Sequence, residues 1–178
     1  MLDDIYDPIR DDDIYESVDV TLSSLEELRE ITERDRLALA PVLQSLKDAG
    51  YYAYGTFDDQ QRWSIAVDDE AGRVDARVGR DGIEVAIWTS SPGMFADEEN
   101  EWRRKAQQRL ARMQINAISR GQLAPHQQAM WDEVEAGIAV RVTYELPFTR
   151  AAYAGPFVRE HFPEVDEVLG FVESQIDV

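Results

Sequence analysis

Four short segments between residues 51 and 89 alternate apolar and polar side chains with a period of two. They are centred on residues 51–57, 63–67, 74–78 and 83–87. A period of two places one set of side chains in a core and the other set on the opposite face. The links between the segments are too short for helices, so the pattern predicts an antiparallel meander. One face of this sheet is free to take a partner.

Helical periodicity appears before the meander. Ser23 and Ser24 are each followed three residues later by a glutamate, which predicts a helix start and a helix over 23–34. Pro41 is expected to separate this helix from a second one that ends near Gly50.

The second half of the chain mixes helices with one further strand. A long helix is predicted over 97–120, and Pro125 is expected to start a short helix carrying Met130 and Trp131. A fifth strand is predicted over 137–146. The remainder is expected to be helical in pieces, interrupted by Gly155–Pro156 and by Pro163.

Together these elements predict an α+β fold in which an antiparallel β-meander packs against helices. The chain has 178 residues, enough for one domain with a substantial core. We expect residues 1–20 to be a flexible acidic tail, because dense acidic blocks repel themselves. Residues 21–178 are expected to form a single domain.

The charge balance excludes some partners and favours others. The formal net charge is −18, from 36 acidic and 18 basic residues. Duplex DNA and anionic membranes would be repelled by that field, whereas a basic protein surface would be attracted. The charge can also serve solubility alone.

The sequence offers little for catalysis or for a cofactor. It contains no cysteine, which excludes disulfides, thiolate catalysis and Cys-based zinc sites. His126 and His161 lack a partner histidine at metal-ligand spacing, so we expect no metal or cofactor. The first residues do not resemble a secretory signal and no apolar run is long enough to span a membrane, so we expect a cytoplasmic protein.

The candidate partner-binding residues lie in two places. The tail repeats an acidic pair followed by Ile-Tyr, which predicts charged and aromatic anchors at Asp3, Asp4, Tyr6, Asp12, Asp13 and Tyr15. Trp88 is expected on the sheet face opposite Ile83, Val85 and Ile87, next to small residues. Such a surface is expected to be covered, either by the chain's own helix or by a second subunit or partner.

Several residue runs carry a family resemblance. They are the run 43–51 before the sheet, Asn100-Glu101-Trp102 at the start of the long helix, and the strand ending in residues 144–148. With this element order, the chain resembles the YbjN family, whose fold is similar to that of type III secretion chaperones. The likeness covers residues 36–176 and departs from the family pattern in the tail, in the helix at 23–34 and between residues 100 and 137. It implies an α+β domain without enzymatic activity that binds other proteins, often as a homodimer.

These observations favour a non-enzymatic, chaperone-like adaptor or regulatory protein. It would act as a homodimer and bind a protein client, plausibly a basic or nucleic-acid-binding one, without contacting nucleic acid or membranes itself. Two alternatives stay open: an acidic mimic of nucleic acid that acts as an inhibitor, and a carboxylate-dependent enzyme.

Overall fold

The structure is a computed structural model that describes residues 11–178, with side chains described from residue 24 onward. It is an α+β fold, as the sequence predicts, and the antiparallel meander is confirmed. Its elements are α1 (Asp11–Asp48), β1 (Ala53–Phe57), β2 (Trp63–Asp69), β3 (Gly72–Val78), β4 (Ile83–Ser91), α2 (Glu101–Gly121), β5 (Gln127–Asp132), β6 (Gly137–Leu146), the 3-10 helix η1 (Phe148–Tyr153) and α3 (Ala154–Gln175).

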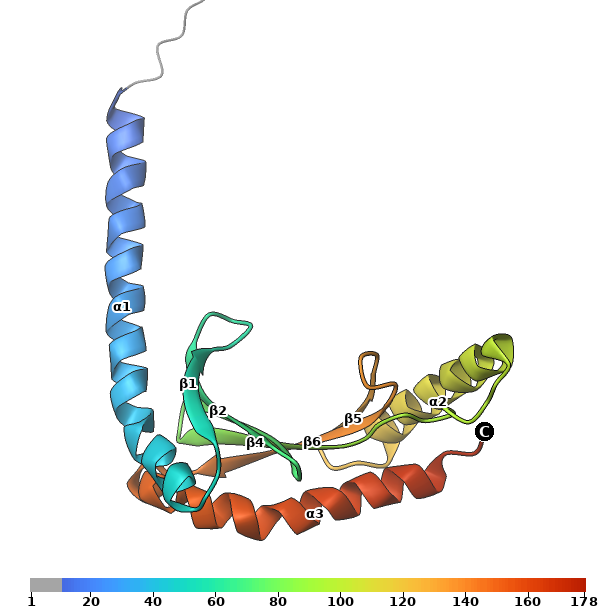
Figure 1. The fold of residues 1–178 in the computed structure, drawn as a ribbon. Helices are drawn as coiled ribbons and strands as arrows, with labels where there is room; N and C mark the ends of the chain where they lie inside the picture. Colours follow the sequence, from blue (N-terminus) through green and yellow to red (C-terminus); the bar gives the residue numbers. More distant parts are fainter. Residues whose placement is uncertain (1–10) are drawn as a thin grey trace, which may run out of the picture.

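The sheet has six antiparallel strands in the order β1-β2-β3-β4-β6-β5. The first four follow one another along the chain, and β6 then pairs with β4 through Ile87↔Val142. In Figure 1 the sheet is strongly curved, with β1 and β2 rising at one end and β5 at the other. The sheet therefore has a hollow face and an opposite face.

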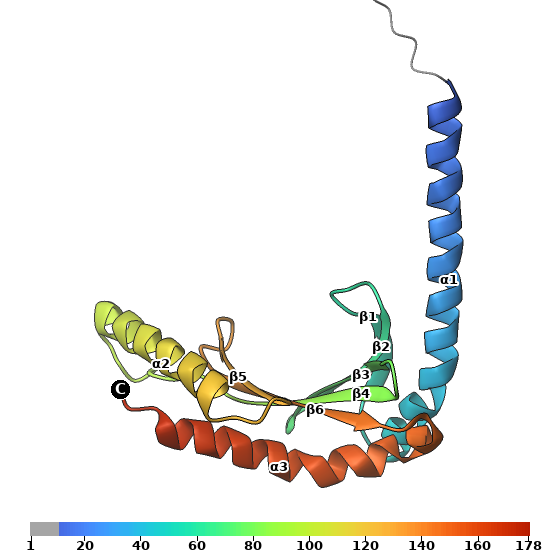
Figure 2. The ribbon, with the colours of Figure 1, turned by 180° about the vertical axis from the view of Figure 1, so that it is seen from behind.

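Helices cover only the face opposite the hollow. Figures 1 and 2, which view the molecule from opposite sides, both show α3 running beneath the sheet. The C-terminal end of α1 lies beside the first turns of α3. Side chains at alternate strand positions, such as Val67, Val74 and Ile87, are fully buried on this face. They pack with Leu39 and Val42 of α1 and with the apolar residues of α3. This burial is the main source of stability.

The first helix differs from the sequence prediction. α1 is continuous through Pro41, so the expected pair of helices separated at this proline is wrong. Proline removes one hydrogen bond, and Figure 1 shows α1 bending near its C-terminal end. Leu39, Val42 and Leu46 are buried on both sides of the proline, and their packing outweighs the lost bond. α1 begins at Asp11, so residues 11–20 of the expected flexible tail are helical, while residues 1–10 lie outside the described residues.

Two further predictions are wrong for a similar reason. Residues 127–132, expected within a short helix, form strand β5, because they pair with β6 and bury Ala129 against Val140. Long-range pairing decides the conformation of such a short segment. α3 is continuous through Pro163, which lies between the packed residues Phe162 and Val165.

A close contact between helices sets the position of α1. The backbone N–H of Gly155 donates a buried hydrogen bond to Oγ of Ser45, at 2.9 Å. A Cβ atom at Gly155 would lie 2.4 Å from the Ser45 carbonyl oxygen and 2.7 Å from Cβ of Ala49. Only glycine lets the two helices approach this closely.

We therefore expect Gly155→Ala to lower the free energy of unfolding by about 1–3 kcal/mol, the usual cost of overpacking. Gly170→Ala is the matched control, because a Cβ at Gly170 of the same helix meets no atom within 4 Å. This control should leave stability unchanged or raise it by up to about 1 kcal/mol. Urea unfolding followed by circular dichroism measures both, and equal effects of the two substitutions would contradict the close contact.

Candidate functional site

A groove of about 650 Å³ lies between the β2–β3 turn and the β5–β6 turn. Strands β4 and β6 run between these turns, because the sheet order places β3 and β5 on either side of them. We call it the acidic groove. It is lined by Asp68, Asp69, Glu70, Ala71, Gly72, Arg73, Trp88, Thr89, Ser90, Met130, Trp131, Asp132, Glu133, Glu135 and Ala139.

Both turns are fixed by their own aspartates. Oδ2 of Asp69 accepts a hydrogen bond from the N–H of Ala71, at 3.2 Å. Oδ1 of Asp132 accepts from the N–H groups of Val134 and Glu135, at 2.9 and 3.1 Å. Such local bonds are why aspartate is common in turns. The same residues thus form the turns and supply charge to the groove.

The β2–β3 turn also depends on a close approach to β4. Gly72 has a φ of +153°, and a Cβ atom there would lie 2.0 Å from the carbonyl oxygen of Trp88. Glycine is therefore required where this turn meets the strand that carries the tryptophan.

The groove is strongly negative. Six carboxylates line it, and Arg73 is the one basic residue among its lining residues. Glu133 pairs with Arg112, and Asp68 accepts a hydrogen bond from the hydroxyl of Tyr54 at 2.6 Å. That bond raises the pKa of Tyr54. Within the described part of the chain, the side chains of Glu70 and Glu135 make no ion pair, so their charges are available to a ligand.

Trp88 is half-buried and is held by side chains from neighbouring strands. Its Nε1–H donates to Oδ2 of Asp75, at 3.1 Å. The guanidinium of Arg141 lies 5.3 Å from the centre of the Trp88 ring, and Arg73 pairs with the other oxygen of Asp75. Such contacts fix the ring without a helix. These contacts come from Asp75 of β3 and Arg141 of β6, whereas the chain's own helix was one of the two expected covers.

Part of β4 along the groove has a strand partner on one side only. The pairing of β3 with β4 ends at Arg73↔Trp88. β4 continues to Ser91, and its last three residues pair with β6 through contacts such as Ser90↔Ala139. The opposite edge of this short stretch can pair with another backbone.

The other expected binding residues are not brought to the groove. Asp3, Asp4 and Tyr6 lie outside the described residues, and Asp12, Asp13 and Tyr15 fall in the first turns of α1, where side chains are not described. Sequence reasoning missed the acidic turn at 132–135 and Trp131 as site residues. The acidic residues next to Trp131 are visible in the sequence. Only the strand order, however, shows that two acidic turns lie on either side of the same strands.

The histidines gather around one tyrosine. The rings of His126 and His161 lie 6.4 and 4.5 Å from that of Tyr144. Burial, aided by the nearby Glu164 carboxylate, raises the pKa of Tyr144. Among the residues that the structure describes, no group of three His, Asp or Glu side chains is placed to hold a metal ion.

Comparisons with known proteins do not assign the chain to a family. Its sequence matches no family model and no curated protein, and no solved structure matches it. None of the helices within the described residues has the length and apolar character needed to cross a bilayer. The resemblance to the YbjN family therefore stays a prediction.

The Trp88 contacts lead to a direct test. We expect Asp75→Ala to remove the acceptor of both Trp88 and Arg73 and to lower the free energy of unfolding by about 1 kcal/mol, since Arg73 is largely exposed. Asp75→Asn should lower the free energy of unfolding by less, because the asparagine amide oxygen can still accept a hydrogen bond from the indole N–H. The indole N–H resonance of Trp88 in an NMR spectrum should shift strongly in the Ala variant only. An unchanged resonance in that variant would contradict the hydrogen bond.

Proposed function

We propose that this protein is a non-enzymatic, chaperone-like adaptor that binds a basic segment of another protein in the acidic groove. The observation that carries the proposal is the combination of six carboxylates with Trp88 and Trp131 around one groove. Carboxylates attract lysine and arginine, and tryptophans are frequent centres of binding energy in protein interfaces.

The two kinds of side chain would have different effects on binding. Exposed ion pairs contribute only about 0–1 kcal/mol each, so the carboxylates mainly speed and orient the encounter. Contact with the tryptophans buries apolar surface and slows dissociation. The arginine already stacked on Trp88 shows how a cation fits against this ring.

The free edge of β4 favours an extended client segment. A strand added there would form main-chain hydrogen bonds with residues 89–91, next to Trp88. Alternate side chains of such a strand would face the groove. A segment that alternates basic and apolar residues therefore fits the surface best.

The resemblance to the YbjN family supports a protein client, and a nucleic-acid-binding protein is a plausible source of the basic segment. The alternative function, an inhibitor that mimics nucleic acid, would also depend on the net charge of −18, but its binding would not require Trp88. Dependence on this tryptophan thus distinguishes the two functions.

The test uses a short synthetic peptide of alternating lysine and valine. Its affinity for the full chain should fall steeply with rising salt, mainly through slower association. The double change Asp69→Asn with Glu70→Gln should slow association several-fold, because it removes charge from the groove. Trp88→Ala should instead speed dissociation, by about tenfold or more.

Glu167→Gln is the control, because Glu167 is an exposed residue of α3 that does not line the groove. It should leave both rates nearly unchanged. Circular dichroism must show that the Trp88 variant is folded. Binding that responds equally to the control and to the groove variants would reject the groove as the site.

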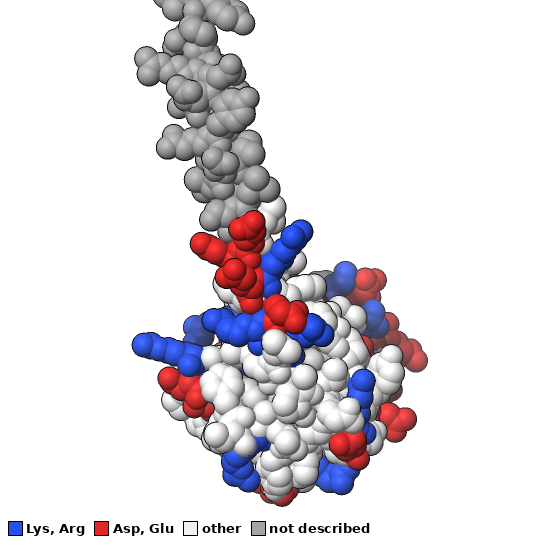
Figure 3. Space-filling view, turned by 90° about the vertical axis from the view of Figure 1, so that its left-hand side faces the viewer, with Lys and Arg blue, Asp and Glu red and all other residues white. Residues whose placement is uncertain are grey.

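We further propose that the protein forms a homodimer through α1. Leu25, Leu28 and Ile31 are exposed at 50, 55 and 38%, and the buried apolar residues of α1 follow further along the same helix. Pairing with a second copy would cover this exposed row. Figure 3 shows acidic and basic side chains side by side on α1 near the body of the molecule, so the repulsion between two copies comes from the formal net charge of −18 that each chain carries.

The dimer should therefore tighten as salt rises, the opposite of the response expected for a basic peptide. Light scattering at high salt should give twice the chain mass, and Leu28→Asp should return it to the monomer mass. Leu37→Asp is the control, since Leu37 is even more exposed than Leu28, at 64%, but lies outside this row. A monomer mass for the unchanged protein at high salt and micromolar concentration would overturn the proposal.

A further inference from the structure

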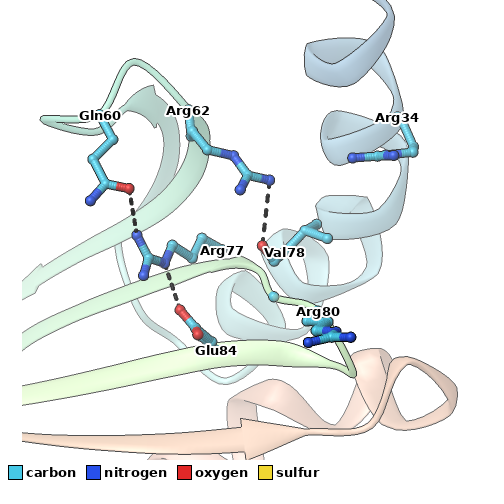
Figure 4. Close-up of a pocket in the computed structure, with 8 residues that line it drawn as sticks. Arg34, Gln60, Arg62, Arg77, Val78, Arg80 and Glu84 are labelled. Carbon is cyan, nitrogen blue, oxygen red and sulfur yellow. Dashed lines mark hydrogen bonds and ion pairs between the residues drawn. The ribbon is translucent and has the colours of Figure 1, made fainter.

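A second cavity, of about 370 Å³, is lined by four arginines although the chain as a whole is acidic. It lies where α1 meets the β1–β2 and β3–β4 turns (Figure 4). We call it the arginine pocket. Its lining residues are Arg34, Gln60, Arg62, Arg77, Val78, Gly79, Arg80 and Glu84.

Two of the arginines are held in place by carboxylates. Arg62 donates to Oδ2 of Asp35, at 2.9 Å, and the Asp35 side chain is only 1% exposed. Nε of Arg77 donates to Glu84, at 2.6 Å, and its Nη1 donates to Gln60, at 3.3 Å. These contacts fix two guanidinium groups before any ligand arrives.

The positive charges of the other two arginines are not neutralised by a close ion pair. Arg34 is 68% exposed, and its nearest carboxylate oxygen belongs to Asp35, at 3.7 Å. Arg80 makes no ion pair or hydrogen bond with any residue in the described range 24–178. Asp35 thus faces both Arg34 and Arg62, and one carboxylate cannot neutralise two guanidinium groups.

Hydrogen bonding in the pocket is also incomplete. Nε of Arg62 is buried and has no hydrogen-bond partner within the described residues, and Oδ1 of Asp35 lacks one as well. Because this nitrogen is buried, it is not among the donors that a ligand in the cavity can reach. The donors available to a ligand are therefore the outer N–H groups of Arg34 and Arg80, next to the fixed guanidinium groups of Arg62 and Arg77.

We propose that the arginine pocket binds the phosphate group of a small phosphorylated molecule. Guanidinium groups match phosphate oxygens with paired hydrogen bonds, and several of them around one cavity suit a doubly charged anion. Val78 is the one residue with an apolar side chain among those lining the cavity, and none of them is aromatic. The ligand is accordingly recognised through its phosphate and not through a stacked ring.

The size of the cavity favours more than one phosphate group. Its volume falls within the range of small-molecule sites, well above the roughly 30 Å³ that one water molecule occupies in the liquid. Pyrophosphate should therefore bind more tightly than inorganic phosphate, because its second phosphate can reach Arg34 or Arg80.

Isothermal titration of the full chain with pyrophosphate, inorganic phosphate and citrate, at constant ionic strength, tests the proposal. Pyrophosphate should bind saturably with one molecule per chain. Arg80→Ala should weaken its affinity about tenfold, the effect of losing one charge-assisted contact. Arg80→Lys should recover only part of the loss, because lysine keeps the charge but not the paired donors.

Arg103→Ala is the matched control, since Arg103 is an exposed arginine of α2 away from the pocket. It should leave the affinity unchanged, and circular dichroism should show both alanine variants to be folded. Citrate binding as tight as pyrophosphate would overturn the assignment to phosphate. Absence of saturable pyrophosphate binding, or equal losses in the Arg80 and Arg103 variants, would overturn the site.

Discussion

The structure depends on the burial of one face of a six-stranded sheet. The helices α1 and α3 pack on the face that carries Val67, Val74 and Ile87, and their buried apolar residues belong to the same hydrophobic core as these strand residues. A sheet buried on one side needs polar or small residues on the other side. The hollow face accordingly carries charged and hydrogen-bonded groups, and it is this face that can accept a ligand or a partner.

Polar contacts organise the hollow face in place of a core. Asp75 joins Arg73 of its own strand to Trp88 of β4, and Arg141 of β6 adds its charge to the same ring. Near the other end of β3, Arg77 pairs with Glu84 across the two strands. Strands β3, β4 and β6 are thus linked by side chains as well as by backbone bonds, which keeps a surface without a covering helix in a defined shape.

The sequence predicted those parts of the fold that have a local signal. Alternation over residues 51–89 and 137–146 predicted five of the six strands, because a strand with one buried face alternates apolar and polar residues along its own sequence. β5 was missed because its conformation depends on β6, and the continuity of α1 through Pro41 depends on Leu39 and Val42 meeting the sheet. These are effects of tertiary packing on short or interrupted segments.

The two sites were less predictable than the fold. Trp88 could be placed on the outer face by counting residues, but Asp69 and Glu133 come together only through the strand order. The arginine pocket is a stronger example, since Arg34 and Arg80 stand far apart in the chain and neither forms a motif with its neighbours. Long-range sites of this kind depend on topology, which composition does not reveal.

Strands β3 and β4 connect two regions of opposite sign. Gly72 and Ser90 lie at the acidic groove, whereas Val78 and Glu84 lie at the arginine pocket. A strand of seven residues spans roughly 20 Å, so charge is separated over that distance within one rigid sheet. The molecule therefore has an electric dipole along these strands in addition to its net charge. A charged surface nearby would exert a torque on the protein and turn one end toward itself before any contact forms.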